Sequence, residues 1–205
     1  MSPTGPDRDA ALAQYRHRAG TYDLELAAFE PIRRLAIERL ALQPGETVLD
    51  VGCGTGLSLA PLTQAVGASG RVIGIEQCPE MIAQARQRAD HRVTLLCAPA
   101  EEAKIVGKAD AALLHFTHDI LRRPEALDHV LRHLKPGARI VATGLQWAPP
   151  WALPVNLFVW AAAWRSVSSL QGLEQPWSLL AERVGQFELQ NLMFGAVFVA
   201  AARRR

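Results

Sequence analysis

The sequence alternates short apolar runs with longer amphipathic stretches, and this alternation limits the folds that the chain can adopt. Runs rich in Val, Ile, Leu and Ala predict strands at residues 47–51, 71–75, 93–97, 109–116 and 138–144. Helical spacing of apolar residues predicts helices over residues 30–42, 57–66, 79–89 and 124–134. Strands that alternate with helices indicate βαβ units. We therefore expect an α/β domain whose parallel sheet is covered by helices on both faces.

Two further strands are predicted near the end of the chain, at residues 187–192 and 195–201. Only the short "MFG" link separates them. Parallel neighbours need a crossover of about a dozen residues or more, so these two strands are expected to run antiparallel.

Composition narrows the class of protein. The chain has 205 residues, of which 49% are hydrophobic and 20% charged, which favours one soluble domain over residues 1–205. A formal net charge of +2 is too small to predict a nucleic-acid partner. Cys53, Cys78 and Cys97 are widely separated, so we expect no disulfide framework and no metal site. The chain shows neither a signal-peptide profile nor a membrane-spanning apolar run, and a cytoplasmic location is expected.

The stretch "VLDVGCGTGLS", residues 48–58, sets Gly52, Gly54 and Gly56 directly behind a strand that carries Asp50. A strand, a glycine-rich turn and a helix together present backbone N–H groups to a polar ligand that comes close to the chain. The alternative is that these glycines only make a tight turn. Glu76 ends the next strand, at the spacing where an acid can bind both hydroxyls of a ribose. Because Leu57 replaces the third glycine of G-x-G-x-x-G, the pattern differs from a nicotinamide or flavin fingerprint.

Five stretches together resemble the class I S-adenosylmethionine (SAM) dependent methyltransferases of the small-molecule type. They are "VLDVGCGTGLS", "VIGIEQCPEMIAQAR", "LCAPAEEA", "ADAALLHFTHDIL" and "LKPGARIVATG". The resemblance runs from about Leu24 to Ala201 and is most specific up to Gly144. It implies a Rossmann-like, doubly wound sheet of seven strands in the order 3-2-1-4-5-7-6, mostly parallel with one antiparallel strand. It also implies SAM as cofactor and S-adenosylhomocysteine as product.

The resemblance assigns roles around the cofactor. Asp50 would hold the ammonium group of SAM, and Glu76 would bind the ribose hydroxyls. The remaining implied contacts are the turn residues Gly52, Cys53, Gly54 and Gly56 at the amino acid end, Gln77 and Met81 near ribose and adenine, Ala100 and Glu101 at the adenine edge, and the backbone of His115 at the methionine part. Pro99 stands where the family often has an aspartate for the adenine amino group.

The acceptor side is less constrained by the sequence. In "HFTHD", His118 is a candidate general base and Asp119 a candidate partner that orients it, while a loop residue and a helix cap are the alternative roles. Residues 1–42 are expected to form a helical lid, from which Tyr22 would contact the cofactor and Tyr15 the substrate. Simple packing on the domain is the alternative for both tyrosines. Cys53 is interpreted as a small spacer and not as a nucleophile.

A segment at residues 145–180 contains all five tryptophans of the chain. Its apolar residues fall all around a helix, so we expect burial against the domain, a second subunit or a hydrophobic acceptor. Our prediction is an acceptor-side wall or lid that includes Trp147 and Trp151. A homodimer through this segment and a peripheral membrane contact both stay open.

The predicted function is SAM-dependent methyl transfer to an oxygen, nitrogen or carbon nucleophile of a small, fairly hydrophobic molecule. One alternative is a phospholipid N-methyltransferase, in which the tryptophan-rich segment and the terminal "RRR" would face a membrane. A second alternative is a regulatory or assembly subunit that binds SAM without catalysis.

Overall fold

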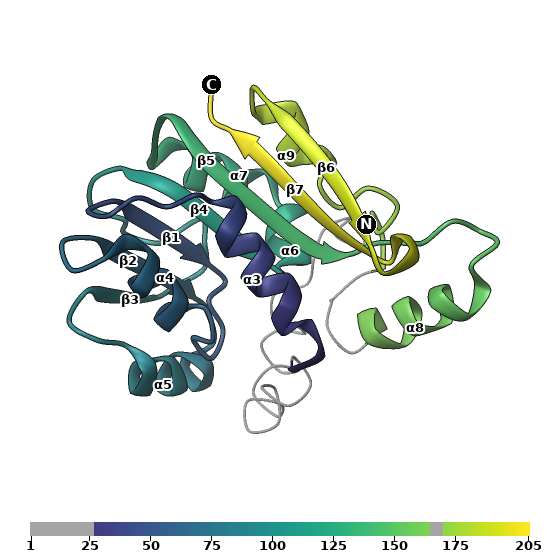
Figure 1. The fold of residues 1–205 in the computed structure, drawn as a ribbon, viewed down its shortest axis with the longest axis horizontal. Coiled ribbons are helices and arrows are strands. Elements are labelled where there is room, and N and C mark those ends of the chain that lie inside the picture. Colours follow the sequence, from purple (N-terminus) through teal and green to yellow (C-terminus); the bar gives the residue numbers. More distant parts are fainter. Residues whose placement is uncertain (1–26, 165–169) are drawn as a thin grey trace, which may run out of the picture.

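The computed structural model describes residues 27–164 and 170–205, which form a seven-stranded sheet in the order β3-β2-β1-β4-β5-β7-β6 (Figure 1). The strands are β1 (Thr47–Val51), β2 (Arg71–Glu76), β3 (Val93–Cys97), β4 (Ala109–His115), β5 (Leu134–Leu145), β6 (Phe187–Leu192) and β7 (Val197–Arg203). The first five strands pair in parallel, and β7 runs antiparallel to both β5 and β6. This topology confirms the predicted Rossmann-like fold class.

Helices cover both faces of the sheet (Figure 1). The first face carries α3 (Glu30–Arg39), α4 (Leu59–Val66) and α5 (Pro79–Arg88), and the opposite face carries α6 (His118–Leu121), α7 (Pro124–Arg132) and α9 (Ser178–Arg183). Helix α8 (Leu153–Trp164) lies beyond the sheet, beside the β6–β7 turn (Figure 1), and its residues Val159 and Ala163 belong to the core cluster of the first face. Two short 3₁₀ helices complete the described elements, η1 (Ala27–Phe29) and η2 (Met193–Gly195).

The central strands are apolar along nearly their whole length because both of their faces are covered. Residues 48–51 of β1 and 111–114 of β4 are all buried. Asp50 is the one charged residue in these two stretches. A buried charge in the middle of a sheet needs a specific reason, because its desolvation is costly.

Two predicted boundaries differ from the structure around β5. The strand begins at Leu134, and the preceding helix ends at Arg132 instead of continuing to Leu134. Ala109 pairs with Leu134, whereas Ala111 pairs with Arg139, so the residues between these two pairs bulge out of the ladder. The bulge contains Pro136 and Gly137, and the Gly137 φ of 75° suits a glycine. Pro136 and Gly137, which in the sequence indicate a turn before the strand, therefore lie in a bulge inside β5.

The link between β6 and β7 is tighter than its sequence suggests. Met193 and Phe194 both adopt left-handed conformations, with φ of 50° and 55°. This strained turn occupies residues 193–195, and β7 consequently begins at Val197, two residues later than predicted.

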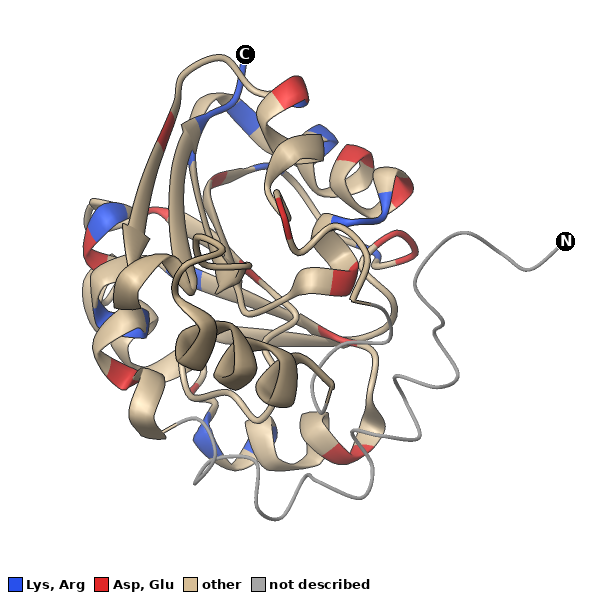
Figure 2. Cartoon of the chain, turned by 90° about the vertical axis from the view of Figure 1, so that its right-hand side faces the viewer, with Lys and Arg blue, Asp and Glu red and all other residues tan. Residues whose placement is uncertain are grey.

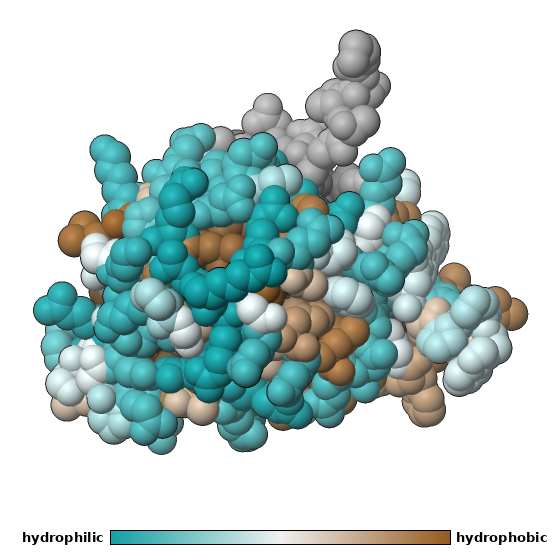
Figure 3. All heavy atoms as spheres, turned by 90° about the horizontal axis from the view of Figure 1, so that it is seen from above, coloured by the Kyte–Doolittle hydropathy of each residue, from teal (hydrophilic) through white to brown (hydrophobic). Residues whose placement is uncertain are grey.

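The hydropathy of the surface is relevant to contacts with other molecules or with a membrane. Seen from above, the molecule is mainly hydrophilic, and pale or brown residues mark the right-hand end where Figure 1 places α8 (Figure 3). No helix within residues 27–164 or 170–205 is long and apolar enough to cross a membrane.

Candidate active site

The glycine-rich turn joins β1 to α4 at the carboxyl edge of the sheet. Gly52, Gly54 and Gly56 have φ of 73°, 56° and 85°, a region that side chains rarely tolerate. A Cβ atom at Gly52 would lie 2.5 Å from Thr117 Cγ2, and one at Gly56 would lie 3.0 Å from Ala85 Cα. Protein packing therefore already explains two of the glycines, and close approach of a ligand is not needed to explain them.

The side chain of Glu76, at the end of β2, accepts hydrogen bonds from the backbone of two neighbouring turns. Its Oε2 accepts a hydrogen bond from the Gly54 N–H at 3.1 Å, and its Oε1 accepts one from the Cys78 N–H at 2.8 Å. Burial raises the pKa of Glu76, and these backbone bonds oppose the rise. Each carboxylate oxygen has a second lone pair, so the group can still accept from two hydroxyl donors.

Asp50 lies beside this turn and is only 2% exposed. Its Oδ2 is buried and has no hydrogen-bond partner among the residues that the structure describes. Burial raises the pKa of Asp50 to about 7, the positive charge of Arg33 opposes this rise, and the charge of Glu76 adds to it. A buried carboxylate with an unused oxygen is suited to a cationic ligand.

Arg33 is a site residue that the sequence analysis missed. It lies on the buried face of α3 and is 3% exposed. Glu30 pairs with its guanidinium, but Arg33 Nε is buried without a partner in the described part of the chain. A signal for it existed, because Arg33 precedes the buried residues Ala36 and Ile37 by three and four positions. The site thus holds a buried cation as well as two acids.

His115, at the end of β4, contributes more than the backbone contact that the resemblance implied. Its Nδ1 lies 2.7 Å from the hydroxyl of the fully buried Thr143 on β5. Burial, together with the charge of Arg33, lowers the pKa of His115 to about 3. The imidazole is therefore neutral at pH 7. Its Nε2 is buried and makes no hydrogen bond within residues 27–164 and 170–205.

His118, in α6, is a second neutral imidazole. Its Nε2 lies 3.2 Å from the backbone carbonyl of Gln171. A carbonyl only accepts hydrogen bonds, so Nε2 carries the proton and Nδ1 keeps its lone pair. Burial lowers the pKa of His118, and the negative charge of Asp119 opposes the shift. Nδ1 is buried without a hydrogen bond in the described structure, so it has the protonation state that a general base requires.

The residues predicted to surround the adenine differ in burial and in their contacts. Met81 and Ala100 are buried, while Gln77 is half-buried. Glu101 forms an ion pair with Arg123, at 2.6 Å between Oε1 and Nη1, so an adenine would have to share this carboxylate. The Cys53 sulfur packs over β2, where a Cβ at Gly74 would lie 3.0 Å from it, and burial raises its pKa. These facts suit a spacer role for Cys53.

The two tryptophans predicted to line the acceptor side, Trp147 and Trp151, lie in different surroundings in the structure. Trp147 is half-buried, and its backbone N–H donates to the Leu173 carbonyl at 2.9 Å, which ties it to the loop that also contacts His118. Trp151 is exposed. Nearby, the indole of Trp177 donates to the buried amide of Gln146 at 3.3 Å. Tyr15 and Tyr22 lie outside the described residues.

Comparison with known proteins identifies the central part of this chain. Residues 48–137 match the family model described as a methyltransferase domain. That region contains β1 to β4, the glycine turn, Asp50 and Glu76. It carries a methyltransferase domain of the class I, SAM-dependent type. SAM is accordingly the cofactor of the methyltransferase domain, as predicted.

Individual relatives agree with this assignment. Aklanonic acid methyltransferase DauC of Streptomyces sp. (strain C5) is 32% identical over 61% of this chain and 60% of its own length. The ubiquinone/menaquinone biosynthesis C-methyltransferase UbiE of Geobacter sp. (strain M21) is 35% identical over 60% of this chain and 54% of its own length. The chain thus spans little more than half the length of these curated relatives. Other matches are named for 23S rRNA or ribosomal protein L11 as acceptors.

The fold of the methyltransferase domain also matches solved structures. The N-methyltransferase NodS from Bradyrhizobium japonicum WM9, solved with S-adenosyl-L-homocysteine, superposes with a TM-score of 0.70. The two chains are 16% identical, and the match covers 95% of this chain and 98% of NodS. At this identity the likeness concerns the fold.

Proposed function

We propose that this chain transfers the methyl group of SAM to an oxygen, nitrogen or carbon nucleophile of a small, fairly hydrophobic molecule. The observation that carries the proposal is Asp50. A charged group buried in the centre of the sheet, with one oxygen unpaired beside the glycine turn, fits a protein that binds an ammonium group there.

The charged groups of the site match the polar groups of SAM. Asp50 would take the ammonium, and the Glu76 carboxylate, already oriented by two backbone N–H groups, would take the ribose hydroxyls. Arg33 adds a buried guanidinium with an unused Nε, which suits the cofactor carboxylate. Met81 and Ala100 offer apolar surface for the adenine ring. The residues present therefore fit the cofactor.

The chemistry needs little from the protein beyond alignment. Bound SAM would supply an electrophilic methyl group on its sulfonium; the acceptor's nucleophile would form a bond to that methyl carbon as the carbon–sulfur bond breaks, and S-adenosylhomocysteine would leave as a neutral thioether. Holding the acceptor in line and excluding water accounts for much of the acceleration in such reactions. When the nucleophile carries a proton, a base must remove it, and His118 Nδ1 is the candidate for this role. Hydrogen bonding to the Gln171 carbonyl fixes the tautomer that leaves this nitrogen unprotonated.

The acceptor class is inferred from the surroundings of the site. Trp147 and Trp177 lie in the segment that follows β5, close to the loop that contacts His118. Residues 140–164 contain no charged residue, whereas an RNA acceptor would call for Lys and Arg. One relative is named for aklanonic acid and another for ubiquinone/menaquinone biosynthesis, which supports the same choice.

A labelling experiment tests the proposal. Protein is incubated with SAM that carries a radioactive methyl group and with three separate fractions of cell extract: organic-soluble metabolites, total RNA and total protein. We expect label in the organic-soluble fraction with wild type and with Glu188→Ala, an exposed control on β6, and much less label with Glu76→Ala at a SAM concentration near the wild-type Kd. Label in RNA or protein would refute the acceptor class. Equal labelling by Glu76→Ala would refute the site.

A further inference from the structure

Helix α8 has one face whose large apolar side chains are exposed within the part of the chain that the structure describes. Ala152, just before the helix, and Val159 and Ala163 within it are buried against the domain. Four large residues, which we call the outer stripe, are instead between 47% and 72% exposed: Leu153, Leu157, Trp160 and Trp164. The sequence predicted burial for this apolar helix, and the structure provides that burial on one side only.

The outer stripe has the spacing of a helix–helix contact. Its residues follow one another at intervals of four, three and four, which keeps them within a narrow band along the helix. The rings of Trp160 and Trp164 lie 6.0 Å apart between centroids. The one polar side chain of α8, Asn156, faces the domain, because its amide hydrogen-bonds the backbone of Ala148 at 2.9 and 3.2 Å.

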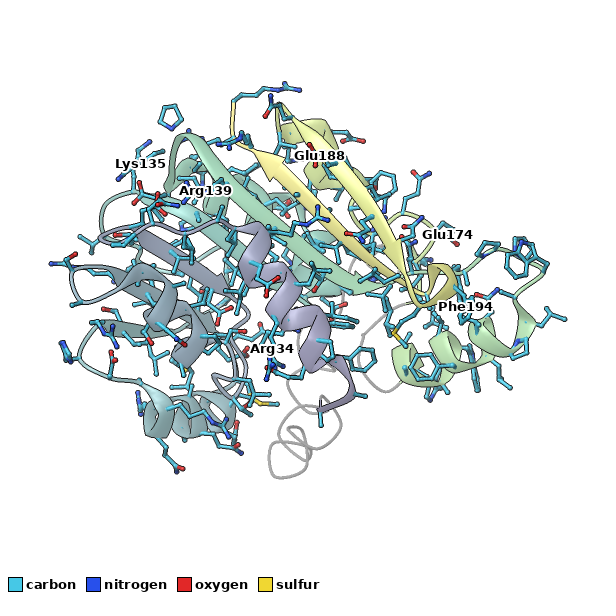
Figure 4. All side chains as sticks on the ribbon, in the orientation of Figure 1. Arg34, Lys135, Arg139, Glu174, Glu188 and Phe194 are labelled. Carbon is cyan, nitrogen blue, oxygen red and sulfur yellow. The ribbon has the colours of Figure 1, made fainter. Side chains whose placement is uncertain are left out.

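The β6–β7 turn extends this apolar surface. Phe194 is 80% exposed and lies at the end of the hairpin beside the segment that leads into α8 (Figure 4). A Cβ at the adjacent Gly195 would lie 2.9 Å from Pro149, which shows how closely the turn packs against that segment. Phe194 thus combines a left-handed backbone with an exposed aromatic side chain, and packing among the described residues does not explain this combination.

The same surface carries no charge. Residues 140–164 lack Asp, Glu, Lys and Arg, and Figure 2 shows α8 and the loop before it without a charged residue. In a two-fold interface each patch meets an identical patch, so a patch with charges of one sign would repel its copy and an uncharged patch would not.

The exposed area is on the scale of a dimer interface. Trp151, Trp160, Trp164 and Phe194 are between 47% and 80% exposed. At about 200 Å² for a whole aromatic side chain, these four expose about 500 Å². A standard interface takes about 800 Å² from each partner, and the exposed leucines of the outer stripe supply much of the rest.

We propose that the outer stripe, together with Trp151 and Phe194, binds a second copy of this chain, so that two α8 helices pack across a two-fold axis. A helix that lies on a lipid surface typically has a broad apolar face opposite a polar face rich in Lys and Arg, and α8 has no such charged face. The proposal concerns association alone, and it stands whether or not the methyl transfer proposed above is correct.

Light scattering coupled to gel filtration tests the proposal with the full chain. At micromolar concentration we expect wild type at twice its monomer mass of 22.4 kDa, and Leu157→Glu at the monomer mass. Val106→Glu is the matched control, because Val106 is 90% exposed in the loop between β3 and β4. It should remain dimeric. Circular dichroism of each variant establishes that the fold is retained.

Mixing two variants of opposite charge provides a second test, which measures a gain of association and not a loss. Leu157→Glu and Leu157→Lys are each expected to be monomeric, and their equimolar mixture is expected to recover the dimer mass through opposite charges across the axis. A monomeric wild type, a dimeric Leu157→Glu or a mixture that stays monomeric would overturn the proposal. A monomeric wild type that floats with phosphatidylcholine vesicles would assign the stripe to lipid instead.

Discussion

Replacing Asp50 with asparagine tests two effects of the buried carboxylate: its contribution to cofactor binding, and its destabilisation of the unliganded fold. We expect Asp50→Asn to bind S-adenosylhomocysteine at least about tenfold more weakly, because the charge that faces the ammonium is lost. We also expect the unliganded variant to be more stable than wild type at pH 8. A site residue that destabilises the unliganded fold is retained for its ligand.

The magnitude follows from the pKa of Asp50, which burial raises from 3.8 to about 7. The folded protein therefore holds this proton more tightly than the unfolded chain does. Between about pH 4 and pH 7 the stability that Asp50 contributes falls as pH rises, and above about pH 7 the loss is complete. A rise of about three pKa units corresponds to about 4 kcal/mol. The buried amide of asparagine itself lacks partners, which costs about 1–3 kcal/mol, so the expected gain at pH 8 is about 1–3 kcal/mol.

Urea unfolding followed by circular dichroism, at pH 4 and at pH 8, measures this gain. Asp128→Asn is the matched control, because Asp128 is 49% exposed in its side chain and pairs with Arg183 at the surface. The control should change the free energy of unfolding by less than about 1 kcal/mol at either pH. If Asp50→Asn is no more stable than wild type at pH 8, or if its advantage is the same at both pH values, the argument for a destabilising buried carboxylate is refuted.

Three further substitutions test the remaining site assignments. Glu76→Ala should weaken SAM binding in calorimetry by roughly 10–150-fold, or about 1.5–3 kcal/mol, and a folded variant with normal affinity would remove the ribose role. Gly54→Val should abolish SAM binding, because Gly54 has a φ of 56° and a branched side chain would fill the ligand space; normal binding would make the turn purely structural. His118→Asn should lower turnover by about 10²–10⁴ without changing SAM affinity, and unchanged turnover would exclude His118 as the base.

The sheet could be predicted well because its signals are local. β1, β3 and β6 begin and end where the apolar runs predicted. The antiparallel placement of β7 followed from the short link after β6. The start of β5 was missed because Pro136 and Gly137, normally signs of a turn, lie in a bulge inside the strand. A bulge depends on pairing with β4, which a local sequence pattern does not contain.

The site could be predicted only in part, because its important features depend on contacts between distant segments. Asp50 and Glu76 were found from their position at the ends of predicted strands. Arg33 was missed, since only the packing of α3 on the sheet turns this residue inward. The unusual pKa of His115 arises from burial and from Arg33, which is far away in the sequence. For α8, the composition predicted an apolar helix, but the division into a buried and an exposed face required the structure.

The central claim is that SAM lies across the glycine turn, with its amino acid end at Asp50 and its ribose at Glu76. A crystal structure of the chain with S-adenosylhomocysteine tests this most directly. We predict the ribose hydroxyls within hydrogen-bond distance of the Glu76 carboxylate, the amino group beside Asp50 Oδ2, and Arg33 Nε turned to the cofactor carboxylate. A ribose bound away from Glu76, or an Asp50 Oδ2 that stays unpaired with the cofactor in place, would contradict the account.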